Sequence, residues 1–238
     1  MKLKVLICTP SVGQCKFSYS MSLCNMVGYF CTTQVFPECM TQEVEFYGIE
    51  GSGVSSARET MIDKALEGDY THILFIDEDM MFPKDALHQL LRRRQDMVGA
   101  NYRKKLPPGT WLAVSVDEQE RVATTDASSG LQEVTYTGFG FFLMSRKAME
   151  AVKPPRFLLR WLDDINGYST EDVVYMQKAR EAGMNVYIDH DLTKQIGHIG
   201  ILDYRYNNDY SGIKTAYVLT DVAHEKKAEE HRQLKAVA

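Results

Sequence analysis

The sequence contains no long apolar run, and this absence argues against a membrane-spanning helix. A helix that crosses a bilayer needs about 20 consecutive apolar residues. The apolar core of the first segment, residues 5–8, is far shorter than that and is also too short for a signal peptide. We therefore expect a cytoplasmic protein with no membrane partner.

Cysteine is scarce and is confined to one end of the chain. The five cysteines all precede residue 40, their number is odd, and no C-x-x-C is present. These features exclude a disulfide framework and the usual zinc-finger spacings. We interpret the cysteines as free, buried thiols in a reducing compartment.

An excess of basic residues is also lacking, because 32 acidic residues outnumber 27 basic ones and give a net charge of −5. The overall field would therefore repel a nucleic acid, and any such contact must come from local clusters. Two clusters are present, residues 92–94 with Lys84 nearby, and residues 103–105.

The first half of the chain alternates between strand and helix patterns. With 238 residues, of which 45% are hydrophobic, the chain suits one large α/β domain. Ser56 and Glu59 fit a capping box that opens the second helix, and Pro83 fits the first position of the third. The predicted strands are 3–8, 44–49, 71–76 and 97–100, and the predicted helices are 18–33, 56–66 and 84–94. This order predicts a largely parallel sheet with helices on both sides.

The second half has a different pattern. Residues 110–137 alternate apolar and polar positions, as antiparallel strands do, and a glycine-containing apolar segment follows at 138–144. A helix is predicted from about Thr170 to Gly183, and a strand at 186–188. We expect a single catalytic domain over residues 1–238, with 201–238 as a C-terminal helical extension.

Two aspartates, Asp77 and Asp79, directly follow the apolar strand at 71–76. Because strand side chains alternate faces, both carboxylates are expected to point the same way, about 7 Å apart. They lie at the carboxyl end of a strand, where open α/β sheets bind ligands. Two like charges held there need a cation, and hard oxygen ligands suit Mg²⁺ or Mn²⁺ bridged to phosphates. The pair therefore predicts a divalent-metal site.

An apolar strand followed by Asp-x-Asp resembles the metal site of the GT-A glycosyltransferases. The order of motifs over residues 3–200 is similar to that of the large inverting family 2 within this group. The resemblance implies a GT-A fold, a nucleotide-sugar donor, Asp79 as a metal ligand, and Asp77 near the ribose or a metal-bound water.

Two further elements resemble the donor-binding parts of that family. The helix with Arg58, in Ser55-Ser56-Ala57-Arg58-Glu59, is similar to an Ala-Arg-Asn/Asp element near the nucleotide, although Glu replaces the usual Asn or Asp. Gly138 and Gly140 resemble the glycine-containing strand beside the donor sugar and the acceptor. The resemblance also implies that Thr9 and Pro10 bind the nucleotide.

The Thr170-Glu171-Asp172 sequence resembles the Thr-Glu-Asp of inverting GT-A enzymes. In that family the aspartate is the general base that deprotonates the acceptor hydroxyl, so the resemblance assigns catalysis to Asp172 with Glu171. The start of a helix would help to keep such a carboxylate ionised.

A late histidine supplies another metal ligand in many GT-A enzymes. His198, in Gly197-His198-Ile199-Gly200, fits this role, and His190 is the rival. Neutral imidazole is a good ligand, and flanking glycines let the backbone approach phosphates. The Gln-x-x-Arg-Trp motif of processive synthases is absent, so polymer synthesis is not expected.

The resemblance predicts a metal-dependent inverting transfer from a UDP-sugar, with UDP-glucose favoured, to a hydroxyl acceptor. The chain also resembles small phage-type GT-A proteins, some of which add sugars to modified DNA bases. A hydroxymethylated base in double-stranded DNA is therefore one expected acceptor, a glycan or small molecule is another, and a phage-encoded chain would act in the host cytoplasm.

Other classes remain as alternatives. Asp-x-Asp also opens the haloacid-dehalogenase phosphatases, where the first Asp is a nucleophile, but there it follows the first strand. A nucleotidyltransferase lacks its glycine-rich loop at residues 9–15, and a Rossmann dehydrogenase lacks the third glycine after Gly51 and Gly53. A noncatalytic sugar-binding protein would need neither Asp172 nor metal.

Overall fold

The computed structural model describes residues 2–105, 109–117, 120–162 and 167–200. The chain forms two compact units, one of residues 1–158 and 171–200 and the other of residues 159–170 and 201–238. In the second unit, the described residues form a two-stranded antiparallel ladder, β9 with β10. The predicted C-terminal helix falls outside the described residues, so the prediction of one domain with a helical extension stays a prediction.

The strands of the described residues are β1 (Lys2–Ser11), β2 (Thr41–Glu50), β3 (His72–Ile76), β4 (Met80–Met81), β5 (Met97–Gly99), β6 (Val114–Ser115), β7 (Leu131–Tyr136), β8 (Phe141–Ser145), β9 (Trp161–Leu162), β10 (Gly167–Tyr168), β11 (Val186–Asp189) and β12 (Gly197–His198). The helices are α1 (Phe17–Thr32), α2 (Val54–Glu67), α3 (Ala86–Arg92), α4 (Arg146–Ala151), α5 (Glu171–Glu181) and α6 (His190–Thr193).

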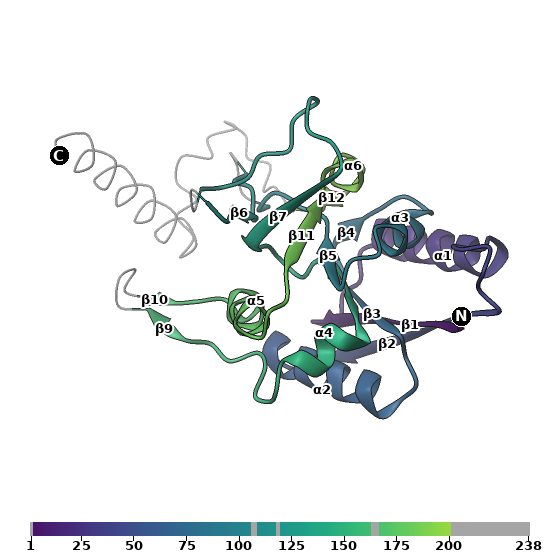
Figure 1. Ribbon diagram of the computed structural model, residues 1–238, viewed down its shortest axis with the longest axis horizontal. Coiled ribbons are helices and arrows are strands. Elements are labelled where there is room, and N and C mark those ends of the chain that lie inside the picture. Colours follow the sequence, from purple (N-terminus) through teal and green to yellow (C-terminus); the bar gives the residue numbers. More distant parts are fainter. Residues whose placement is uncertain (1, 106–108, 118–119, 163–166, 201–238) are drawn as a thin grey trace. The chain divides into compact units, whose positions relative to one another are not determined.

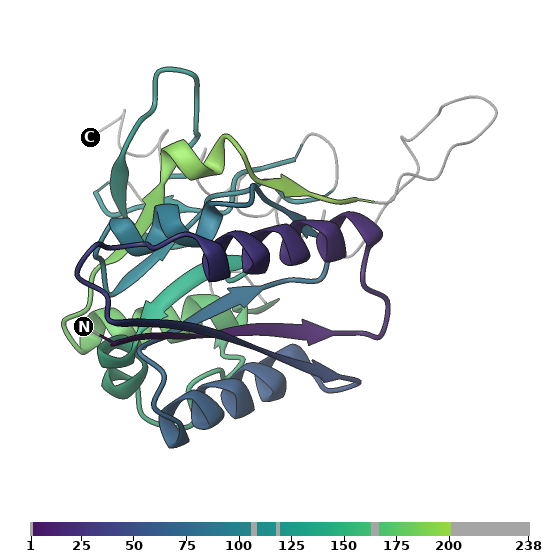
Figure 2. The same ribbon diagram turned by 90° about the vertical axis from the view of Figure 1, so that its right-hand side faces the viewer.

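The central sheet of the larger unit has eight strands in the order β2-β1-β3-β8-β5-β11-β7-β6. Only β7 and β8 run against the other six, because each pairs antiparallel with both neighbours while the remaining pairs are parallel. Helices α1, α3 and α6 cover one face and α2, α4 and α5 cover the other (Figures 1 and 2). The predicted α/β class, a mixed and mostly parallel sheet flanked by helices, is confirmed.

Two buried cores lie on the two faces of this sheet, and the central strands contribute to both. Along β3, Ile73 and Phe75 belong to the core under α2, α4 and α5, whereas Leu74 and Ile76 belong to the core under α1 and α3. A strand covered on both faces is apolar at every position, which explains the uninterrupted apolar run before Asp77.

Two predicted helix starts are wrong. Helix α2 begins at Val54 with Gly53 as its N-cap, and no side chain caps it. Glu59 accepts hydrogen bonds from the backbone and the guanidinium of Arg156 instead, so the expected capping box does not form. Helix α3 begins at Ala86 after Asp85, and Pro83 lies in the preceding turn.

The prediction that the cysteines are buried is correct only for Cys8 and Cys39. Cys15, Cys24 and Cys31 are exposed, the last two on outward-facing positions of α1.

No described helix is both long and apolar enough to cross a membrane.

A half-buried histidine, His72, at the start of β3 makes stability depend on pH. Burial lowers the pKa of His72 from 6.5 to about 4, although the charge of Asp96 acts in the opposite direction. The unfolded chain then binds this proton more readily, so stability is complete above pH ~6.5 and is lost as the pH falls towards 4. We expect His72 to remove about 2 kcal/mol from the free energy of unfolding over this interval.

Urea unfolding of the wild type and of His72→Gln at about pH 7 and about pH 4 measures this effect. The variant should lose about 2 kcal/mol less than the wild type between the two pH values. Equal losses in the two proteins would contradict the assignment, because all other titrating groups are shared.

Candidate active site

The candidate site lies where β1, β3 and β5 end, at the carboxyl edge of the sheet, as expected for an open α/β fold. The turn after β3 contains the two aspartates, and the loop after β1 is hydrogen-bonded to this turn through Glu78. Glu78 accepts a hydrogen bond from the backbone N–H of Val12 at 3.2 Å and another from the hydroxyl of Ser11. The backbone N–H of Lys16 donates to the carbonyl of Glu78 at 3.3 Å.

Asp77 and Asp79 do not share a direction, which corrects the prediction that their carboxylates point the same way. Strand β3 ends at Ile76, and the chain turns at once, with the N–H of Met80 donating to the carbonyl of Asp77 at 3.1 Å. The alternation of side chains therefore stops before the motif. Asp77 faces Arg58, whereas Asp79 faces Lys105 and His198.

Arg58 is the centre of a buried charge cluster on the Asp77 side. Its side chain is 3% exposed, and its guanidinium donates to Asp77 at 2.9 Å and to Glu171 at 2.6 Å. It also lies over the rings of Phe75 and Phe139, 5.9 and 5.4 Å from their centroids. Helices α2 and α5 and the turn after β3 are thus joined through one cation.

Electrostatics keeps this cluster charged. Burial opposes the charge on Arg58, but Asp77, Glu171 and Asp172 outweigh it and raise the pKa of the guanidinium. Asp172 is therefore within electrostatic range of Arg58, and it also acts on Tyr102. The structure places both acids at the start of α5, Glu171 in the ion pair and Asp172 beside it.

On the other side of the turn, His198 lies opposite Asp79. The antiparallel pairing of β12 with β4 aligns His198 with Met80, and the N–H of Ile199 donates to the carbonyl of Asp79 at 2.8 Å. The imidazole Nε2 of His198 lies 3.5 Å from Oδ1 of Asp79, and that buried oxygen accepts no hydrogen bond from the described residues.

The other imidazole nitrogen fixes the form of this histidine. Nδ1 of His198 lies 2.7 Å from the carbonyl oxygen of Arg103, and a carbonyl only accepts, so Nδ1 carries the proton. In the neutral ring, Nε2 then presents a lone pair towards Asp79, which is the usual arrangement of a metal-ligating histidine and its backbone partner. Lys105 forms an ion pair with the other oxygen of Asp79.

These groups suit a divalent cation held by few protein atoms. Burial raises the pKa of Asp79, but Lys105, together with His198 when its Nε2 is protonated, outweighs burial and lowers that pKa. A metal ion would replace the Nε2 proton of His198 beside this carboxylate. Among the described residues, no group of three or more His, Cys, Asp or Glu side chains is arranged around one metal position. The protein thus offers two ligands, Asp79 and His198, and Mg²⁺ or Mn²⁺ would take the rest from phosphates and water. Asp77 as a third ligand stays a prediction.

Tyr102, which the sequence did not reveal, explains the two glycines of the 138–140 segment. Its phenol is buried and accepts a hydrogen bond from the N–H of Gly140 at 2.7 Å. A Cβ atom would come within 2.3 Å of the phenol oxygen at Gly138 and within 2.4 Å at Gly140. Burial, with the charges of Asp77 and Asp172, raises the pKa of Tyr102 well above its ordinary value, so the phenol stays protonated.

The predicted nucleotide residues Thr9 and Pro10 lie near the end of β1 and are buried. The hydroxyl of Thr9 shares a 2.5 Å hydrogen bond with the phenol of Tyr19 on α1. This hydroxyl is therefore engaged within the protein, and any contact of Thr9 with a nucleotide would come from elsewhere on the residue.

The rival histidine and the first basic cluster have structural partners. His190 bonds Thr124 and Gln132, both at 2.8 Å, so both of its ring nitrogens are occupied. Arg93 pairs with the fully buried carboxylate of Asp189 at 2.7 Å. Arg94 pairs with Glu38 at 2.9 Å. The cluster at 92–94 thus serves the fold, which weakens its case as a nucleic-acid surface.

The sheet, its two helical layers and a site at the carboxyl edge define an α/β protein with a mixed, mostly parallel sheet. Among solved structures, the chain is similar to A197 from STIV, with a TM-score of 0.51, 18% identity, and coverage of 86% of this chain and 100% of that one. It is also similar to S. aureus TarS 1–349 in complex with UDP-GlcNAc, with a TM-score of 0.46, 11% identity, and coverage of 87% and 62%. A second structure of S. aureus TarS 1–349 has a TM-score of 0.42 and 9% identity, and the match covers 79% of this chain and 57% of that one. No protein-family model and no curated protein matches the sequence. At these identities the similarity concerns the fold alone.

Proposed function

We propose that this protein is a metal-dependent inverting glycosyltransferase that moves a sugar from a UDP-sugar to a hydroxyl acceptor. The observation that carries the proposal is the facing pair of Asp79 Oδ1 and His198 Nε2, 3.5 Å apart at the carboxyl edge of the sheet. A buried oxygen without a donor and an imidazole with its lone pair turned towards it are both satisfied by one cation.

The donor, with UDP-glucose as the first candidate, would lie along the ends of β1 and β3. In this proposal Thr9 and Pro10 line the nucleotide end, and Arg58 holds Asp77 in position for the ribose or a metal-bound water. In this proposal Gly138 and Gly140 lie beside the donor sugar, next to the phenol of Tyr102, which occupies the place that a side chain at either glycine would take.

The chemistry divides between the two sides of the turn. Asp79 and His198 would hold a Mn²⁺ or Mg²⁺ ion, which when bound would supply Lewis-acid stabilisation of the leaving diphosphate. Asp172 accepts the proton of the acceptor hydroxyl while the oxygen of that hydroxyl attacks the anomeric carbon. Glu171, held by Arg58 at 2.6 Å, keeps the start of α5 in place. Attack opposite the leaving group inverts the anomeric carbon.

For the acceptor, we propose a hydroxymethylated base in DNA, with a glycan or another small hydroxyl compound as the alternative. The support for DNA is the basic cluster at 103–105, which borders the candidate metal site through the Lys105 contact with Asp79. No corresponding support comes from residues 92–94, because Arg93 and Arg94 form intramolecular ion pairs.

Thermal unfolding with a panel of nucleotides, each with and without Mn²⁺, tests the donor and the metal together. At a concentration of a hundred times its Kd, UDP with Mn²⁺ should stabilise the protein by about 2.7 kcal/mol. For a protein of this size, that corresponds to a rise in Tm of about 5–10 °C. UDP alone, or Mn²⁺ alone, should give a much smaller rise.

The control for this measurement is Asp79→Asn, which should remove the dependence on Mn²⁺. Stabilisation by a bare phosphate mimic in preference to UDP would contradict the proposal and favour a haloacid-dehalogenase-like phosphohydrolase. UDP stabilisation of equal size with and without Mn²⁺ would contradict the metal assignment alone.

A further inference from the structure

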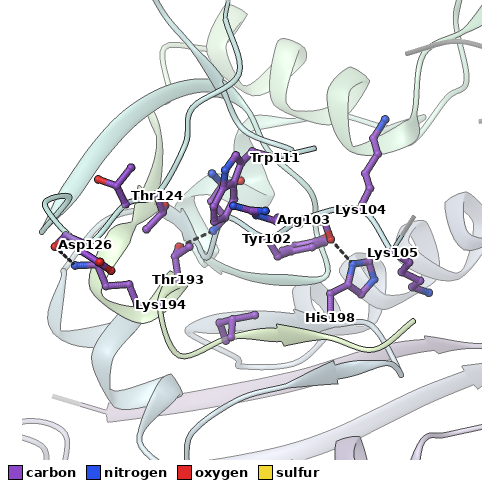
Figure 3. Close-up of a pocket in the computed structure, with 13 residues that line it drawn as sticks. Tyr102, Arg103, Lys104, Lys105, Trp111, Thr124, Asp126, Thr193, Lys194 and His198 are labelled. Atoms are coloured by element: carbon purple, nitrogen blue, oxygen red, sulfur yellow. Dashed lines mark hydrogen bonds between the residues drawn. The ribbon is translucent and has the colours of Figure 1, made fainter. Parts of the chain in front are cut away.

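A cationic pocket adjoins the candidate metal site and is not needed to explain the donor. It has a volume of about 520 Å³ and is bordered at one end by His198 and Lys105 and at the other by Lys194 and Asp126 (Figure 3). Its walls come from the segment after β5, the segment before β7, and the segment that contains α6. His198 and Lys105 belong to both sites, so a molecule in the pocket would lie next to the metal.

The frame of the pocket is fixed by a buried asparagine. The amide of Asn101 donates to the carbonyl of Val122 at 2.8 Å and accepts from the N–H of Ala113 at 3.0 Å. Its backbone N–H donates to the hydroxyl of Thr193 at 2.8 Å, and that hydroxyl donates to the carbonyl of Asp189 at 2.7 Å. These bonds tie the three wall segments together, so the pocket is formed before any ligand arrives.

Arg103 is presented in a way that suits a phosphate. Its guanidinium lies 4.6 Å from the ring centroid of Trp111, which it covers, and the two residues also form a β-bridge. Within the described part of the chain, no carboxylate forms an ion pair with Arg103. A guanidinium held against an aromatic face keeps the in-plane N–H groups of its fork available for a bidentate oxyanion.

Lys194 faces the same pocket from α6 with its ammonium already oriented. Its Nζ donates to the carbonyl oxygens of Asp126 at 3.0 Å and Ser128 at 2.7 Å. An ammonium has three N–H donors, so one remains for a ligand. Because both partners are neutral carbonyls, the positive charge of Lys194 is not cancelled by them.

The balance of charge in the pocket selects the ligand class. The cationic side chains of Arg103, Lys105 and Lys194 line it, against the carboxylate of Asp126. This excess is local, since the chain as a whole has a net charge of −5. Asp79 offsets Lys105, but Arg103 and Lys194 approach from different walls. Several cations around one cavity favour a group with more than one anionic oxygen.

We propose that this pocket binds a phosphate group of the acceptor, so that the acceptor is a phosphorylated molecule. This proposal rests on the proposed glycosyltransferase function, because the bound molecule is an acceptor only if the protein transfers a sugar. The phosphate site itself does not depend on the donor. The phosphate could belong to a phosphomonoester or to a phosphodiester chain, and the same side chains would recognise either.

Isothermal titration calorimetry with inorganic pyrophosphate, ribose 5-phosphate and a short single-stranded oligodeoxynucleotide tests the site. Each lost bond to a charged group should weaken binding about tenfold. We therefore expect Arg103→Ala and Lys194→Ala each to weaken binding of the preferred probe by about tenfold, and Arg103→Lys to weaken it less. Ribose 5-phosphate as the tighter probe would indicate a monoester, and the oligonucleotide a phosphodiester chain.

The matched control is Lys147→Ala with Lys153→Ala, which removes two exposed positive charges that do not line the pocket. It should bind the probes as the wild type does. Citrate is the matched ligand, since it is a multivalent anion without phosphate. Equal binding of citrate, or equal weakening by the control variant, would overturn the proposal and leave only a general attraction for anions.

Parallel titrations with UDP and Mn²⁺ separate this inference from the proposed function. Loss of UDP binding in Arg103→Ala and Lys194→Ala as large as the loss of probe binding would assign the pocket to the donor and overturn the proposal. If UDP fails to bind the wild type while the phosphate probes bind and respond to the variants, the phosphate site stands and the glycosyltransferase assignment falls. If UDP binds and no phosphate probe does, the phosphate site is wrong and the glycosyltransferase assignment stands.

Discussion

Replacing Asp172 by asparagine is expected to reduce sugar transfer by about 10²–10⁴-fold, the usual contribution of a general base. The amide keeps the size of the side chain at the start of α5 but cannot accept the hydroxyl proton. Binding of UDP with Mn²⁺ should be retained, because the proposed metal ligands lie on the other side of the turn after β3. The assay is transfer from UDP-glucose to hydroxymethylated DNA, with hydrolysis of UDP-glucose measured alongside.

A matched control for this variant is available on the same helix. Glu181→Gln makes the same kind of change at an exposed position at the other end of α5, and it should transfer sugar at the wild-type rate. Transfer by Asp172→Asn at a rate close to that of Glu181→Gln would show that another group accepts the proton.

Replacing Arg58 by alanine is expected to lower the free energy of unfolding by about 3–5 kcal/mol. The change removes the cation that joins Asp77 and Glu171 and leaves two partly buried carboxylates without it. It also removes the planar guanidinium that lies over the rings of Phe75 and Phe139. Urea unfolding monitored by circular dichroism measures the loss.

Arg94→Ala is the appropriate comparison, because its ion pair with Glu38 is on the surface, where the arginine side chain is 68% exposed. Such pairs contribute at most about 1 kcal/mol. In addition, Asp77→Asn and Glu171→Gln placed together in the Arg58→Ala background should recover part of the stability, since they remove the unpaired charges. Equal losses for Arg58→Ala and Arg94→Ala would rule out a buried charge cluster.

The fold could be predicted from the sequence where residue patterns depend only on burial. The apolar run before Asp77 predicted a central strand, and β3 is covered on both faces by cores that share its residues. Gly183 predicted the end of α5, and its φ of 82° is the left-handed conformation that glycine adopts most easily. In both cases the signal is local and has one physical cause.

The site could be predicted only in part, because its contacts depend on where strands end and how loops return. The pairing of Arg58 with Glu171 joins residues far apart in sequence, and the order of motifs suggested that they share a site. The separate directions of Asp77 and Asp79 follow from a strand that ends one residue before the motif, which no periodicity reveals.

One residue of the site carried no usable signal. Tyr102 lies in the irregular segment after β5, and an aromatic residue in a loop is ordinary. Lys105 belongs to the basic cluster at 103–105, but the sequence did not predict its contact with Asp79. Two glycines separated by one residue, Gly138 and Gly140, are consistent with close packing against the backbone. The group that packs there, Tyr102, is set by the tertiary structure.

The two-stranded ladder of β4 and β12 links cation affinity to the docking of one short segment. It joins only Met80 with His198 and Met81 with Gly197, so few backbone bonds hold the imidazole next to the turn. An ion bound by both Asp79 and His198 would connect the two strands of that ladder and stabilise their pairing. Because such coupling is reciprocal, any change that detaches residues 197–199 would weaken binding of the ion by the same free energy. His198 would therefore both bind the metal and help to keep β12 paired with β4.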